Sequence, residues 1–104
     1  MDTLETEKEF KPKWKGKEDK EIVLVIRKLT PAEKNSCWTN DNGTMGADLS
    51  QFIRKGVSSV KGLTWYGKKI QTGTDICDTV GLDILFAETA REVVSYNTVP
   101  IPKN

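Results

Sequence analysis

Hydrophobic residues are densest at residues 22–26 (IVLVI), a largely β-branched run that follows a stretch of charged residues. The run is too short for a membrane-spanning helix, which requires roughly 20 apolar residues. It predicts a strand over residues 21–29 that is buried on one or both faces. Directly after it, Thr30 and Glu33 have the spacing of a helix capping box, and Pro31 occupies the first helical position. A short helix is therefore expected to follow the strand.

A second helical pattern begins at Asp48, which stands three residues before Gln51 in the same capping arrangement. Gly56 is placed to end this helix. Its apolar face consists of Leu49, Phe52 and Ile53. The preceding segment, residues 40–47, is rich in polar residues and glycine. We expect it to be the loosest part of the chain.

Residues 57–70 combine spaced apolar positions with two glycines, Gly62 and Gly67. This pattern predicts a β-hairpin or a bent strand pair, with the glycines at a bulge and a turn. The strongest helical pattern follows at residues 82–96, which present a wide apolar face. Gly81 is expected either to kink that helix or to separate it from a shorter one at residues 75–80. Together these elements predict an α+β fold in which a small, largely antiparallel sheet of three or four strands is packed by a long C-terminal helix, with one or two shorter helices.

Length and composition fit one folded domain, because 104 residues with 37% hydrophobic and 30% charged residues bury one modest core. We place the domain at residues 21–97. It is preceded by a polar, basic-aromatic arm at residues 1–20 and followed by an extended tail at residues 98–104. The net charge of +1 gives no overall field that would draw the chain onto nucleic acid or a membrane. The acidic N-terminus lacks the apolar core of a signal peptide, so the chain is expected to stay in the compartment where it is made.

The residues that most often carry catalysis or bind metals are scarce. The chain has no histidine, and its two cysteines, Cys37 and Cys77, lie far apart in the sequence. This composition excludes a Ser/His/Asp centre and a zinc site with four close His and Cys ligands. We predict two reduced, mostly buried thiols, with a disulfide as the alternative, and no catalytic residue, metal or cofactor. An enzyme would require at least two carboxylates to converge in one pocket, and the candidates are Asp75, Asp78, Asp83, Glu88 and Glu92.

A basic and aromatic segment precedes the first predicted strand. We interpret it as an arm that docks on another protein through aromatic anchors. The predicted anchors are Phe10, Trp14, Trp65 and Tyr66. The alternative is a nucleic-acid-binding module, in which phosphates are bound by Lys11, Lys13, Lys15 and Lys17. A second basic group would add to these lysines if the fold brings it close, and it consists of Arg54, Lys55, Lys61, Lys68 and Lys69.

The order and spacing of several features over roughly residues 9–96 resemble those of a known family. The features are the entry Phe10-Lys11-Pro12-Lys13-Trp14, the charged-then-apolar strand from Glu21 to Ile26, the helix start Leu29-Thr30-Pro31-Ala32-Glu33, the short helix ending at Gly56, the run Val57…Val60…Leu63 that meets Gly67, and Thr74-Asp75 before a helix containing Glu88. In these respects the chain resembles the small tail assembly proteins of long-tailed bacteriophages, of the tail assembly chaperone type. The family has no short binding motif, so the resemblance assigns no functional residues.

The resemblance implies a non-enzymatic phage or prophage protein that acts by binding other chains. A tail assembly chaperone would hold the long tape-measure protein while tail-tube subunits polymerise around it. A minor structural protein at the head–tail junction of the virion is the related alternative. The expected partners are therefore a tape-measure or tail-tube type protein and further copies of the chain in a homo-oligomer, without a membrane. The expected location is the cytoplasm of a bacterial host, or the virion.

Overall fold

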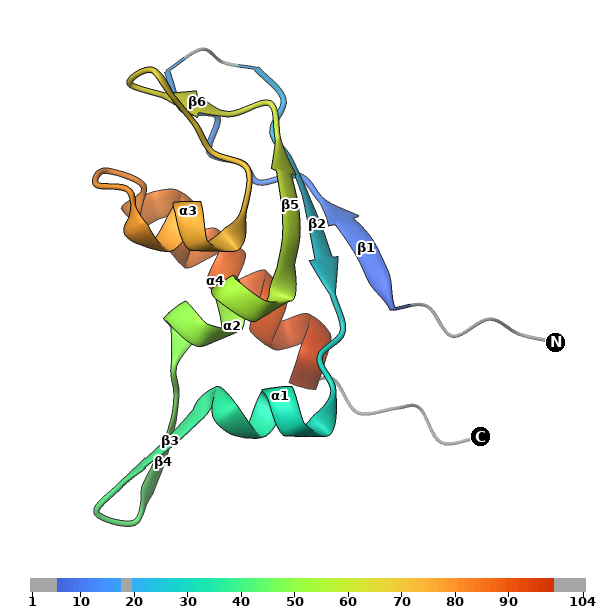
Figure 1. Ribbon diagram of the computed structural model, residues 1–104, viewed down its shortest axis with the longest axis vertical. Helices are drawn as coiled ribbons and strands as arrows, with labels where there is room; N and C mark the ends of the chain where they lie inside the picture. Colours follow the sequence, from blue (N-terminus) through green and yellow to red (C-terminus); the bar gives the residue numbers. More distant parts are fainter. Residues whose placement is uncertain (1–5, 18–19, 99–104) are drawn as a thin grey trace, which may run out of the picture.

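The computed structural model describes residues 6–17 and 20–98, and these residues form seven strands and four helices (Figure 1). The strands are β1 (Glu7–Phe10), β2 (Val23–Arg27), β3 (Trp38–Asp41), β4 (Thr44–Ala47), β5 (Val57–Lys61), β6 (Thr64–Trp65) and β7 (Lys68–Lys69). The helices are α1 (Pro31–Ser36), α2 (Leu49–Gly56), α3 (Gly73–Asp78) and α4 (Asp83–Thr98). All strand pairs are antiparallel, and α4 is the long C-terminal helix, so the predicted α+β class is confirmed.

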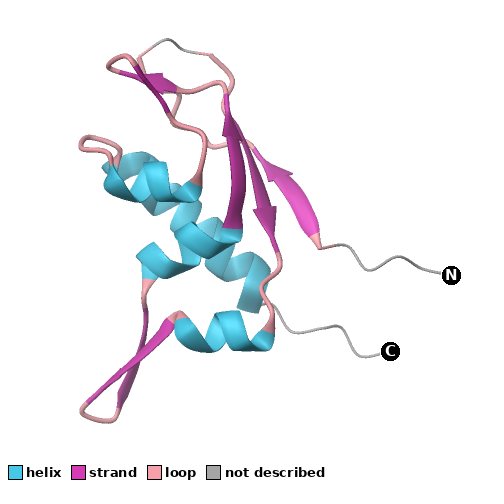
Figure 2. Cartoon of the chain, in the orientation of Figure 1, coloured by secondary structure: helices cyan, strands magenta, loops and turns pink. Residues whose placement is uncertain are grey.

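The largest sheet has the strand order β1-β2-β5, with the predicted hydrophobic strand in the centre. Leu24 and Ile26 of β2 are fully buried in the core. The strand register places Phe10 and Val60 on either side of Leu24, so these three side chains share one face of the sheet. The helices lie to one side of this sheet, and α4 packs against α2, α3 and β2 (Figure 2).

The folded part of the chain begins before residue 21, where the sequence analysis placed the start of the domain. Residues 7–10 form β1 at an edge of the sheet. Lys8 forms an ion pair with Glu92 of α4, and Pro12 is buried. Because β1 has no hydrophobic run of its own, its position depends on pairing with β2 and on these contacts. Of the predicted tail, only residue 98 is described, and it is the last residue of α4.

The segment predicted to be the loosest part of the chain instead contains a regular β-hairpin. β3 and β4 pair in continuous register from Trp38↔Ala47 to Asp41↔Thr44. The turn consists of Asn42 and Gly43, whose φ angles are 53° and 80°, and two positive φ angles are typical of a type I′ turn. In Figure 1 this hairpin projects from the helical part of the molecule at the end opposite to β6.

A second hairpin joins β6 and β7 within the predicted strand region. Here β5 pairs with β2 rather than with the segment that follows it. The chain leaves β5 at Gly62, which has φ +85° and no space for a side chain, since a Cβ would lie 2.3 Å from the carbonyl oxygen of Glu21. Tyr66 and Gly67 then form the turn between β6 and β7, again with positive φ angles of 49° and 81°.

The helices begin where their capping residues predict. Thr30 and Glu33 form the predicted capping box of α1, and the Asp48 side chain accepts a hydrogen bond from the backbone N–H of Gln51 at the start of α2. Thr72 caps α3 in the same way as Thr30 caps α1. Gly81, with φ +95°, lies between α3 and α4, as expected. These caps satisfy backbone donors that the first turn of a helix cannot satisfy by itself.

A buried threonine of α4 has a hydroxyl without a hydrogen bond to any described residue. Thr89 of α4 is fully buried, and its hydroxyl has no hydrogen-bond partner among the described residues. A buried hydroxyl of this kind lowers stability, because it gives up its hydrogen bonds to water and gains none in return.

We therefore expect Thr89→Val to leave the free energy of unfolding unchanged or to raise it by up to about 1 kcal/mol. Thr89→Ser is the matched control, since it keeps the hydroxyl and removes a buried methyl group, and we expect it to cost about 1 kcal/mol. The free energies of unfolding of the two variants are compared by urea unfolding. A loss of stability in Thr89→Val greater than in Thr89→Ser would show that the hydroxyl is hydrogen-bonded in the folded protein.

Candidate functional site

Three aromatic side chains from distant parts of the sequence meet at one end of the molecule. Trp14 and Trp65 have their ring centroids 5.3 Å apart, with the ring planes tilted by 55°. Trp65 and Tyr66 are 5.0 Å apart and nearly perpendicular. Both separations are typical of attractive aromatic pairs. We call Trp14, Trp65 and Tyr66 the aromatic cluster.

The two tryptophans of the cluster are held by hydrogen bonds to other elements. The indole N–H of Trp65 donates to the backbone carbonyl of Val80, between α3 and α4, at 3.0 Å. Gly81 makes room for this ring, because a Cβ at that position would lie 3.0 Å from the indole nitrogen. The backbone N–H groups of Lys13 and Trp14 donate to the two carboxylate oxygens of Glu88 in α4, at 2.9 and 3.0 Å. The cluster therefore ties the basic segment, the β6–β7 hairpin and α4 together.

Large apolar side chains are exposed on the β6–β7 turn and around the connection between α3 and α4 that holds Trp65. Tyr66 is 74% exposed, and Val80, whose carbonyl accepts the hydrogen bond from Trp65, is 92% exposed. Ile84, in the first turn of α4, is 61% exposed. The remaining exposed large hydrophobic residues among those described, Trp38 and Leu49, are 37% and 41% exposed and belong to β3 and α2. We call Tyr66, Val80 and Ile84 the apolar patch.

Lysine side chains border the apolar patch. The ammonium nitrogen of Lys17 lies 3.8 Å from the centroid of the Tyr66 ring, in a cation–π contact. Lys68 donates a hydrogen bond to the hydroxyl of Thr79, beside Val80, at 3.1 Å. Both basic groups singled out in the sequence thus contribute to this end of the molecule, but only in part. Arg54, which the sequence analysis grouped with the hairpin lysines, instead forms an ion pair with Asp78 at 2.6 Å.

Phe10, the fourth predicted anchor, lies outside the cluster. It is half-buried against the core, on the face of the sheet that packs against the helices. It also lines a hollow of about 370 Å³ together with Lys11, Lys13, Glu88, Arg91 and Glu92. The structure thus brings together three of the four aromatic residues predicted as anchors.

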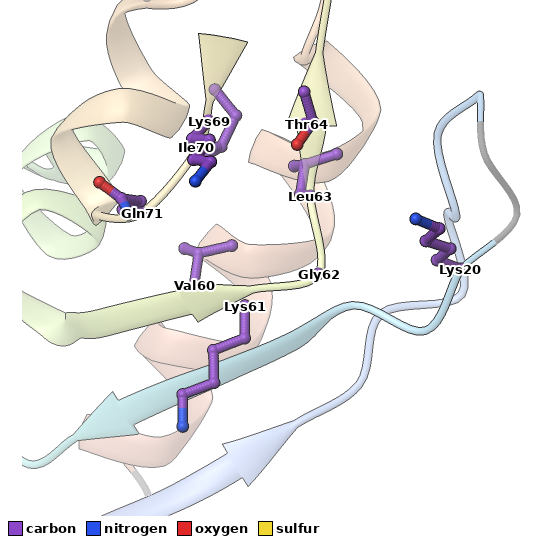
Figure 3. A pocket seen from close by; sticks show the side chains of 9 residues that line it. All are labelled: Lys20, Val60, Lys61, Gly62, Leu63, Thr64, Lys69, Ile70 and Gln71. Carbon is purple, nitrogen blue, oxygen red and sulfur yellow. The ribbon is translucent and has the colours of Figure 1, made fainter. Parts of the chain in front are cut away.

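A second hollow, of about 350 Å³, lies between the end of β5 and the β6–β7 hairpin (Figure 3). Lys20, Lys61 and Lys69 are among its lining residues. In Figure 3 the side chain of Lys61 extends away from that of Lys69, so the three ammonium groups do not converge on one point. The hollow adds positive charge to this end of the molecule without forming a compact anion site.

Two of the carboxylates considered for catalysis, Asp75 and Asp78, have structural roles, and Asp83 lies in the first turn of α4. Asp75 accepts hydrogen bonds from the backbone N–H groups of Gln71 and Thr72, and the bond from Gln71 is the main reason that its pKa is lowered. The hydrogen bond from Arg54 lowers the pKa of Asp78. Asp75 therefore helps to cap α3, and Asp78 joins α3 to α2 through Arg54.

Two further acids do share a hollow. Glu88 and Glu92 both line the hollow beside Phe10, but Glu92 is paired with Lys8 and Glu88 accepts the two backbone N–H groups described above. Neither is left as an unpaired base. Within residues 6–17 and 20–98, His, Cys, Asp and Glu form no group of three or more that could hold a metal ion.

Both cysteines are free thiols. Cys37 is buried, and Cys77 is half-buried and donates a weak hydrogen bond to the carbonyl of Ser50. Burial raises the pKa of each thiol, which lowers the fraction of reactive thiolate.

Two residues of the apolar patch, Val80 and Ile84, were absent from the predicted site. The signal for Val80 is its position between Thr79 and Gly81, where a β-branched residue stands in a predicted break between helices. Ile84 lies beside the predicted apolar face of α4 and not on it. Val80 lies in the connection between α3 and α4, where its carbonyl meets Trp65, and Ile84 lies just after it in α4.

Comparison with protein-family models, with curated proteins and with solved structures finds no match to this chain. Within the described part of the chain, the helices are too short or too polar to cross a membrane.

Proposed function

We propose that this chain is a non-enzymatic assembly or structural protein of a phage or prophage, of the tail assembly chaperone type, that acts by binding another protein. The observation that carries the binding function is the exposed apolar patch of Tyr66, Val80 and Ile84 on the aromatic cluster. The phage context comes from the sequence resemblance. A minor protein of the head–tail junction is the related alternative.

The aromatic cluster that includes Tyr66 has the rigidity of a protein-binding site. Tyr and Trp are enriched among the residues that dominate binding energy at interfaces. Trp65 is fixed by its hydrogen bond to Val80 and by its packing on Gly81, and Tyr66 is packed edge-on against Trp65. Side chains that are already ordered lose little conformational entropy when a partner binds.

The partners that fit the resemblance are a tape-measure or tail-tube type protein and further copies of this chain. The protein would act in the cytoplasm of a bacterial host, and it would remain in the virion if it belongs to the head–tail junction.

We expect Tyr66→Ala to weaken partner binding by about 30-fold, because truncating an aromatic hot-spot residue removes about 2 kcal/mol of binding energy. The measurement is size-exclusion chromatography with light scattering, on the protein alone and mixed with the products of neighbouring genes, followed by titration of any complex. Leu49→Ala is the matched control, since it removes an exposed apolar side chain on α2 instead. A wild-type protein that stays monomeric and binds none of these products would contradict the proposal.

Nucleic-acid binding is the second candidate function, and the lysines that gather around the aromatic cluster favour it. Lys17 already occupies one face of the Tyr66 ring, and the indole N–H of Trp65 is bonded to the backbone. These contacts leave less ring surface for stacking on bases. The aliphatic side chains of Val80 and Ile84 have no charge or hydrogen-bond donor with which to bind phosphates. An electrophoretic mobility shift at low salt that weakens steeply as salt is added would support this function. The absence of a shift at low salt would exclude it.

A further inference from the structure

We propose that the partner segment bound by the apolar patch is an amphipathic helix whose polar face is acidic. This inference rests on the proposed function and adds the chemistry of the partner to it. It follows from the distribution of charge around Tyr66, Val80 and Ile84.

Positive charge is concentrated at the end of the molecule that carries the patch. The described residues 11–17, 20–21 and 61–85, which include the patch itself, contain four acidic residues, Glu21, Asp75, Asp78 and Asp83. Two of them are paired, Glu21 with Lys11 at 3.4 Å and Asp78 with Arg54 at 2.6 Å. The same residues include Lys11, Lys13, Lys15, Lys17, Lys20, Lys61, Lys68 and Lys69. In the sequence, residues 11–21 and 61–85 hold eight lysines and six acidic residues, so the positive charge is in modest excess there and is concentrated in residues 11–20.

The lysines nearest the patch lack carboxylate partners. Lys17 contacts the Tyr66 ring and Lys68 contacts the Thr79 hydroxyl, and among the described residues no carboxylate lies within ion-pair distance of either. The charge of Lys68 still acts at longer range on Asp75 and Asp78, whose pKa values it helps to lower. Some basic side chains elsewhere have acidic partners, as in the pairs Lys8–Glu92, Arg27–Glu33 and Arg54–Asp78. Carboxylates from a binding partner would therefore meet ammonium groups that the fold leaves available.

The apolar side chains of the patch also favour a partner that presents apolar residues to them. Val80 and Ile84 are aliphatic and more than half exposed, and they gain by contact with other apolar side chains. A polyanion such as nucleic acid satisfies the lysines but leaves this surface in water. A segment with apolar residues on one face and Glu or Asp along its margins satisfies both features, and an amphipathic helix places such residues on adjacent faces.

The test is a titration with three synthetic helical peptides of about 18 residues, which is long enough to form a helix on binding. All three carry the same leucine face, and the polar face carries Glu, Gln or Lys. Tryptophan emission reports binding, in a Trp38→Phe background that leaves Trp14 and Trp65 as the only tryptophans. We expect the Glu peptide to bind about tenfold more tightly than the Gln peptide, since several surface ion pairs contribute together. This preference should shrink as salt is raised from about 0.05 M to about 0.3 M.

Charge reversal identifies the lysines responsible. The double variant Lys17→Glu with Lys68→Glu should lose the preference for the Glu peptide and keep the binding of the Gln peptide. Arg91→Glu is the matched control, because it reverses an exposed charge on α4 away from the patch and should leave the preference unchanged.

The outcomes separate this inference from the proposed function. Equal binding of the three peptides, or tighter binding of the Lys peptide, would overturn the acidic partner and leave protein binding at the patch intact. Binding of none of the peptides would also overturn it, while the products of neighbouring genes still test the proposed function independently. Binding of oligo-dT and of no peptide would overturn the acidic partner and favour the nucleic-acid function.

Discussion

Replacing Gly73 by alanine is expected to destabilise the protein by about 2–4 kcal/mol, the largest effect that we predict for adding one methyl group. Gly73 is the first residue of α3, and it is buried against the C-terminal part of α2. A Cβ there would lie 2.2 Å from the carbonyl oxygen of Ile53 and 3.1 Å from the Cβ of Val57. Because the nearest atom belongs to the backbone, α3 would have to move away from α2.

Thermal unfolding measures this effect. For a domain of this size, each 1 kcal/mol corresponds to a Tm change of roughly 4–8 °C, so Gly73→Ala should lower Tm by more than about 8 °C. Thr74→Ala is the matched control, because Thr74 is exposed on the same helix and its replacement should change the stability by less than about 0.5 kcal/mol. Equal Tm values for the two variants would show that α2 and α3 are packed less closely than described.

Replacing Asn97 by alanine is expected to cost about 2–4 kcal/mol, because its buried amide group joins three elements. The side-chain oxygen of Asn97 accepts a hydrogen bond from the backbone N–H of Leu29 at 2.6 Å. Its amide nitrogen donates to the carbonyls of Arg27 and Val93. Alanine would leave the Leu29 N–H, which lies between β2 and α1, buried without this acceptor.

Urea unfolding of Asn97→Ala, with Ser95→Ala as an exposed control on the same helix, tests this prediction. A second variant identifies the hydrogen bonds themselves. Asn97→Asp keeps an acceptor for Leu29 but buries a charge, so its pKa should be raised above that of an ordinary aspartate. The folded state would then bind a proton more readily than the unfolded state, and the variant should be more stable near pH 4 than at pH 7, relative to wild type. A cost of less than about 0.5 kcal/mol for Asn97→Ala would contradict the bridging role.

Local sequence patterns predicted the elements whose residues lie next to one another in the chain. The run at residues 22–26 identified the central strand, and Thr30 and Asp48 marked the starts of α1 and α2. In each case a short stretch contains the whole signal, either as dense β-branched residues or as a side chain that caps its own helix.

The β3–β4 hairpin also has a local signal in the sequence. Asn42-Gly43 is a favoured type I′ pair, but the flanking residues are mostly polar, so the segment was interpreted as loose. The edge strand β1 had no such signal. Residues 7–10 are charged apart from Phe10, and they become a strand because β2 offers them a free edge.

The candidate site was predictable residue by residue but not as an assembly. Trp14, Trp65 and Tyr66 were chosen as anchors because they are large aromatic residues beside lysines. Their convergence depends on contacts over long sequence separations, such as the hydrogen bonds that fasten residues 13 and 14 to Glu88. The sequence could not show these contacts, and it could not show that Phe10 would instead be half-buried against the core.

The most direct test of the central claim is a hydrogen-exchange footprint of the protein bound to a partner encoded by a neighbouring gene. If the apolar patch is the binding surface, exchange should slow at residues 64–69 and 79–85 on complex formation. The β3–β4 hairpin, at the opposite end of the molecule, should exchange as it does in the free protein. Protection confined to residues 38–47, with none near Tyr66, would contradict the claim.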